Sequence, residues 1–98
     1  MLILLCPNCE GLNTHQVGVE VFVRDQEDSD TGTFVSVSGD RKTKVSVESD
    51  ADMKDNPSRR RQGLSIKLDC EICGESSRLD IVQHKGLTCL STRSSQDK

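Results

Sequence analysis

Alternation of apolar and polar residues marks two segments of the chain as β-strands. Valines occupy every second position over residues 17–23, and Leu64, Ile66 and Leu68 alternate with polar residues over 64–69. A period of two residues is typical of a strand with one buried face. We therefore expect two strands here, each with its apolar face turned into the protein.

Three shorter segments have weaker strand patterns. Residues 79–84 predict a third strand, which Lys85-Gly86 should end in a turn before the apolar residues at 87–90. Residues 33–37 and 44–48 are two further strand candidates, and the polar residues between them suit a hairpin connection. No segment has a helical period over a normal helix length. The pattern predicts an all-β chain of antiparallel strands.

Polar residues dominate the middle of the chain. Residues 24–62 hold more than half of the Asp, Glu, Lys and Arg residues, and 49–61 show neither strand nor helix periodicity. A segment of this composition is typically solvent-exposed and flexible. We expect one domain over 1–98 with a long polar, partly flexible excursion at 24–62 and a flexible tail at 91–98.

The composition allows only a thin hydrophobic core. Of 98 residues, 33% are apolar, and the aromatic residues are two phenylalanines. A small domain with so little to bury usually needs disulfides or a metal. The apolar run at residues 1–5 is too short for a signal peptide or a membrane span and lacks a basic flank. We therefore expect a cytoplasmic protein, in which paired cysteines bind metal rather than form disulfides.

Four of the five cysteines form two C-x-x-C pairs, Cys6 with Cys9 and Cys70 with Cys73. Cysteines at this spacing can wrap a tight turn so that both sulfurs reach one ion, and two such turns supply the four ligands of a tetrahedral Zn²⁺. Glycine suits the left-handed position after the second cysteine. Gly74 stands there in the second pair, whereas Glu10 precedes the glycine in the first. We predict one structural zinc bound by these four cysteines.

These motifs resemble the zinc-ribbon group, in which two C-x-x-C knuckles at the tips of β-hairpins clamp one zinc. The resemblance covers residues 1–23 and 64–90 and includes the proline after Cys6. It implies a small zinc ribbon with knuckles at 6–9 and 70–73. The 60 residues between Cys9 and Cys70 exceed the usual spacing. A long insertion explains the difference, because lengthening a loop costs only about 0.6 kcal/mol per doubling.

Other interpretations of the cysteines remain open. Cys6 and Cys9 could form a thiol-redox pair, although redox-active C-x-x-C pairs lie at the start of a helix. Iron accepts the same four thiolates as zinc. We expect Cys89 to be a small buried residue, and His15 and His84 to lie outside the site. With four thiolates bound, zinc has no open position and is structural rather than catalytic.

The net charge and the absence of known catalytic motifs reduce the number of function classes to consider. A net charge of −3 argues against general attraction to nucleic acid. Arg59, Arg60 and Arg61 are the one concentrated positive segment and could contact phosphates, but no stacking aromatics accompany them. Catalytic motifs are absent. We predict a non-catalytic zinc-binding interaction module with a protein partner, or secondarily nucleic acid; a thiol-redox or metal-handling protein is the alternative. We expect a monomer or a weak homodimer paired through a strand edge such as residues 17–23.

Overall fold

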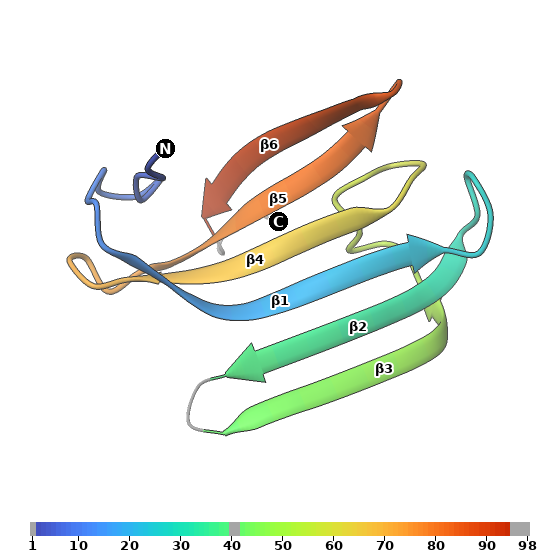
Figure 1. The fold of residues 1–98 in the computed structure, drawn as a ribbon, viewed down its shortest axis with the longest axis horizontal. Coiled ribbons are helices and arrows are strands. Elements are labelled where there is room, and N and C mark those ends of the chain that lie inside the picture. Colours follow the sequence, from blue (N-terminus) through green and yellow to red (C-terminus); the bar gives the residue numbers. More distant parts are fainter. Residues whose placement is uncertain (1, 40–41, 95–98) are drawn as a thin grey trace.

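The computed structural model describes residues 2–39 and 42–94 and is all-β. Six antiparallel strands form a single sheet, confirming the predicted fold class (Figure 1). The strands are β1 (Thr14–Arg24), β2 (Thr31–Gly39), β3 (Thr43–Asp52), β4 (Gly63–Cys70), β5 (Ser76–His84) and β6 (Leu87–Ser94). Within the two described ranges, no helix has the length and apolar character needed to cross a membrane.

The sheet consists of two three-stranded meanders placed side by side. The strand order is β3-β2-β1-β4-β5-β6, so β1–β3 and β4–β6 each run consecutively and meet at the β1–β4 pair. Because β1 has a neighbour on both sides, the expectation that residues 17–23 form a free edge is wrong. The edges of the sheet are β3 and β6.

All five strands expected from the sequence are present as strands, together with a sixth at 87–94. β2 and β3 build a hairpin inside the polar excursion, and β3 continues to Asp52, into the segment where we expected a loop. β6 continues to Ser94, into the expected tail, whose residues 95–98 lie outside the described range. Lys85 and Gly86 both have positive φ, of 50° and 79°, as a two-residue hairpin turn of type I′ requires.

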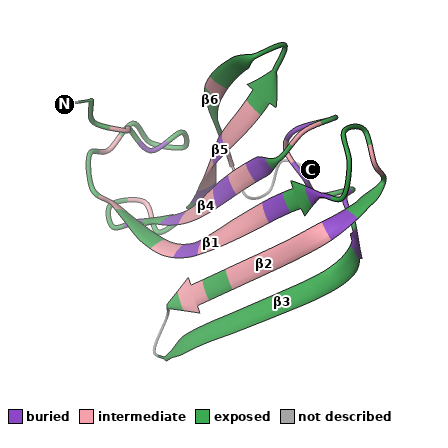
Figure 2. Ribbon diagram, turned by 45° about the vertical axis from the view of Figure 1, so that its right-hand side comes forward, coloured by how far each residue is buried: buried purple, intermediate pink, exposed green. Residues whose placement is uncertain are grey.

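On β1 the buried face is not the one that the valine alternation indicated. On β1, Phe22 and Arg24 are buried, whereas Val23 is exposed and Val19 and Val21 are only half-buried. Figure 2 shows the same contrast, with buried residues on β1, β4 and β5 and an almost wholly exposed β3. The strands were predicted correctly. The expectation of a buried apolar face is wrong for the valines of β1, whereas on β4 Leu68 of the predicted apolar face is buried at 3% exposure.

A loop of the chain itself covers part of the opposite face. Residues 53–62, between β3 and β4, bury Met53 and Ser58, and Met53 joins Phe22 in the core. The rings of Phe22 and Phe34 lie 4.9 Å apart between centroids. Gly63 permits this close approach, because a Cβ there would collide with the side chain of Asn56. Loop 53–62 therefore covers part of one face, around Phe22, and the alternating aliphatic residues form the other face.

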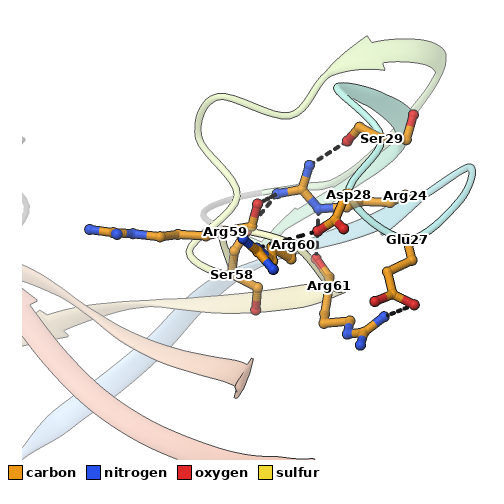
Figure 3. Close-up of polar contacts among 8 residues, drawn as sticks. All are labelled: Arg24, Glu27, Asp28, Ser29, Ser58, Arg59, Arg60 and Arg61. Atoms are coloured by element: carbon orange, nitrogen blue, oxygen red, sulfur yellow. Dashed lines mark hydrogen bonds and ion pairs between the residues drawn. The ribbon is translucent and has the colours of Figure 1, made fainter. Parts of the chain in front are cut away.

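Buried Arg24 holds this loop in place (Figure 3). Its guanidinium donates hydrogen bonds to four backbone carbonyl oxygens at 2.5 to 3.0 Å. The acceptors are Ser29 in the β1–β2 connection and Ser58, Arg59 and Arg61 in loop 53–62. One side chain at the end of β1 thus forms hydrogen bonds to both the β1–β2 connection and loop 53–62. We did not single out Arg24 from the sequence.

Candidate metal centre

The two C-x-x-C knuckles meet at the end of the sheet where β1 begins and β4 ends (Figure 1). Cys6 and Cys9 lie in the segment before β1, Cys70 is the last residue of β4, and Cys73 lies in the turn to β5. Thr14 pairs with Cys70 across the antiparallel β1–β4 ladder. Pairing of the two central strands therefore brings together motifs that are 60 residues apart in the chain.

Both knuckles have the same backbone hydrogen-bond pattern. In each, the backbone N–H of the first cysteine donates to the carbonyl oxygen of the residue five positions further along the chain. The N–H of the residue four positions after that cysteine donates back to the carbonyl oxygen of the cysteine itself. These hydrogen bonds are 2.8 to 3.0 Å long. The residue four positions after the first cysteine is left-handed in both, with φ of 63° at Glu10 and 73° at Gly74. The missing glycine of the first knuckle is thus replaced by Glu10 in a conformation that side chains disfavour.

The four sulfur atoms form a compact group. All four Sγ atoms lie within 4.8 Å of one another. Contacts between the knuckles are 3.8 Å for Cys6 to Cys73 and 3.6 Å for Cys9 to Cys70. Four ligands placed tetrahedrally at about 2.3 Å from a zinc ion lie about 3.8 Å apart, so the observed separations fit such an ion. They are far longer than the roughly 2.05 Å of a disulfide, and all four thiols are free.

The surroundings of the sulfurs favour one thiolate before any ion binds. Hydrogen bonds from the backbone N–H of Cys73, then of Ile72, lower the pKa of Cys70 from 9.0 to about 6. The N–H of Glu75 acts in the same direction on Cys73, but burial and the neighbouring thiols outweigh it and raise the pKa of Cys73 to about 12.

The pKa of Cys9 is also raised: the N–H of Gly11 lowers it, but burial and Cys70 together outweigh that effect. Packing of the four sulfurs therefore disfavours several negative charges at once. A bound cation would relieve this repulsion, which is the behaviour expected of a metal site.

The other candidate ligands lie outside the sulfur cluster. His15 Nε2 lies 3.0 Å from Glu71 Oε2 in an exposed pair, and His84 is at the exposed end of β5. Cys89 is half-buried on β6, opposite Val82. Among the described residues, the group of metal-ligating side chains comprises the four predicted cysteines.

The arginine segment is largely neutralised by the neighbouring acidic connection (Figure 3). Arg61 Nη1 lies 2.5 Å from Glu27 Oε2, and Arg60 Nε lies 3.5 Å from Asp28 Oδ1. Figure 3 shows Arg59 extending away from these two pairs. The three arginines therefore do not present three free charges on one surface.

Comparison of the chain with protein-family models, with curated protein sequences and with solved structures finds no significant match. The functional argument therefore rests on the sulfur cluster and on the surfaces of the sheet.

Proposed function

We propose that this chain is a zinc-stabilised interaction module of the zinc-ribbon kind, in which Cys6, Cys9, Cys70 and Cys73 bind one structural Zn²⁺. The observation that carries the proposal is the compact group of four sulfurs, with separations that fit a tetrahedral ion. Four thiolates fill the coordination sphere, so no position is left for water or substrate. The ion serves folding, and the sheet serves binding of a protein partner.

The thiol-redox alternative has less support. A redox C-x-x-C pair joins its own two sulfurs at the start of a helix, whereas no helix follows Cys9 within residues 2–39. The close Sγ contacts run between the two knuckles. Cys70, the thiol with the lowered pKa, is only 4% exposed and is shielded from a soluble oxidant.

Native mass spectrometry with elemental analysis of the purified protein tests the zinc proposal. We expect one zinc per chain, lost on chelation together with the folded charge-state distribution, because zinc binding contributes about 10 to 16 kcal/mol at such sites. Cys70→Ser should lose the ion, and Cys89→Ser, a matched control outside the cluster, should keep it. Iron in place of zinc would change the metal but keep the site; a chain that folds without metal would refute the proposal.

Nucleic-acid phosphate is the second candidate ligand, because basic side chains outnumber acidic ones in one cleft. The cleft is lined by Arg59, Arg60, Arg61, His84 and Lys85, and by one acidic residue, Glu27, which pairs with Arg61. Its test is fluorescence anisotropy with single-stranded oligonucleotides. Affinity that falls steeply with salt and is lost in Arg59→Ala would favour this candidate, and no binding at low salt would dismiss it.

A further inference from the structure

The uncovered face of the sheet carries two continuous rows of aliphatic residues. Residues directly opposite one another on neighbouring strands share a face. The first row is Val45, Val37, Val19, Ile66, Leu79 and Thr92, and the second is Val47, Val35, Val21, Leu64, Ile81 and Leu90. Eleven of these twelve residues are aliphatic and none is charged.

None of the twelve side chains is buried by the described residues. Val45, Val47 and Leu90 remain 64 to 66% exposed, and the row residues on β1, β4 and β5 are half-buried. The first knuckle reaches one end of this face, where Cys9 meets Cys70. Loop 53–62 covers part of the opposite face, around Phe22. A contiguous aliphatic surface of this extent marks an interaction site.

The whole face has about the size of a standard protein interface. Six strands about 4.8 Å apart, with eight to eleven residues rising about 3.3 Å each, give about 850 Å², and a standard specific interface buries about 800 Å² on each partner. The end of the face at Leu68 and Ser77 is already buried within the chain, so the open part is smaller. The two aliphatic rows span about 380 Å² at its centre on the same spacings. Polar residues such as Gln83 and Thr88 lie beyond them, giving the apolar centre and polar rim of a typical interface.

The distribution of side-chain sizes on this face indicates which partner would bind it. All six positions contributed by β1, β2 and β3 are valines, whereas β4, β5 and β6 contribute leucines, isoleucines and one threonine. A two-fold axis parallel to the strands would place the valine half of one copy on the leucine and isoleucine half of another. Larger side chains then meet smaller ones across the interface, as close packing requires. Two sheets of equal twist also pack face to face at about 30°.

We propose that the aliphatic face binds a second copy of this chain, forming a two-fold symmetric β-sandwich with Val47 of each copy against Leu90 of the other. This inference names the partner of the interaction module proposed above and rests on that proposal. The same patch serves both subunits, as in any isologous dimer. The face requires no charged group from a foreign partner, because it presents none of its own.

Analytical ultracentrifugation of the zinc-loaded full chain over micromolar concentrations tests the proposal. We expect a species of twice the 10.8 kDa chain mass. Val47→Lys should weaken the dimer by about 100-fold or more, because it places an unpaired charge in an apolar interface. Ser46→Lys is the matched control, since Ser46 is the exposed neighbour on the other face of β3 and should leave the dimer intact.

Mixing two monomeric variants tests the arrangement of the subunits. Leu90→Glu should also give monomers, and an equal mixture of V47K and L90E should recover a heterodimer, because opposite charges then meet at one end. A mixture that stays monomeric would refute the axis parallel to the strands. A monomeric wild-type chain, or a V47K variant that still dimerises, would overturn the proposal.

Zinc content and the amide NMR spectrum of each variant separate the two proposals. A folded, zinc-loaded wild-type monomer refutes the dimer and leaves the zinc module standing. A folded wild-type chain that holds no zinc refutes the zinc module instead, and its sedimentation still decides the dimer. V47K should keep both zinc and dispersed amide signals, because Val47 is largely exposed in the single chain; L90E should do so for the same reason.

Discussion

Replacing Arg24 by methionine should cost about 3 kcal/mol of unfolding free energy. The side chain is 8% exposed and donates to four carbonyls, of which the bond to Ser58 is fully buried. A hydrogen bond from a charged group contributes about 1.5 to 3 kcal/mol where water cannot replace it, and less at part-buried positions. We assign about 2 kcal/mol to the Ser58 bond and about 1 kcal/mol to the other three together. Methionine keeps the aliphatic packing and removes the donors.

Urea unfolding of the zinc-loaded protein, followed by far-ultraviolet circular dichroism, measures this loss. The change should shift the transition midpoint with an unchanged slope and lower Tm by about 15 °C, since 1 kcal/mol corresponds to roughly 4 to 8 °C at this size. Arg59→Met is the matched control, because Arg59 is exposed in the same loop and its carbonyl still accepts from Arg24. The reasoning fails if R24M and R59M are equally stable.

Three further predictions concern the knuckles and the core. Glu10→Gly should stabilise the protein by about 1 kcal/mol, because glycine adopts the left-handed conformation at φ 63° without strain; an unchanged urea midpoint would contradict this. Phe22→Ala should cost about 3 to 5 kcal/mol in the same assay, and Phe22→Leu markedly less; equal losses would show that Phe22 does not fill the core.

Zinc binding at pH 7.5 should release fewer than four protons per ion, because the pKa of Cys70 is lowered to about 6 and its thiol is already ionised. The sign follows from ligand deprotonation: a proton lost before binding is not released on binding. Calorimetry in buffers of different ionisation enthalpy counts the protons, and four per ion would disprove the prediction.

Local patterns in the sequence predicted local features well. Alternation at Val17–Val23 and at Leu64–Leu68 located β1 and β4, and the two C-x-x-C pairs located the sulfur cluster. Alternation identifies an apolar face but does not reveal which face the rest of the chain will cover. That outcome depended on loop 53–62, which lies against the sheet because Ser58 in the loop and Gly63 at the start of β4 are small.

Contacts between residues far apart in the chain could not be predicted from the sequence. Arg24 bonds to carbonyls 34 to 37 residues away, and backbone carbonyls have no signature in a residue pattern. Pairing of β1 with β4 likewise joins strands separated by a whole hairpin. The polar excursion therefore looked solvated, although its arginines and acids pair with one another and its backbone anchors a buried guanidinium.

The order of strands in the sheet also bears on synthesis of the chain. A ribosome adds about 5 to 20 residues per second, so the 60 residues between the knuckles take about 3 to 12 s to follow Cys9 out of the ribosome. All residues of β1, β2 and β3 are synthesised within this interval, before β4, which pairs with the free edge of β1. An unpaired strand edge is a template for association with other chains. The nascent protein thus exposes its central strand until the second knuckle arrives.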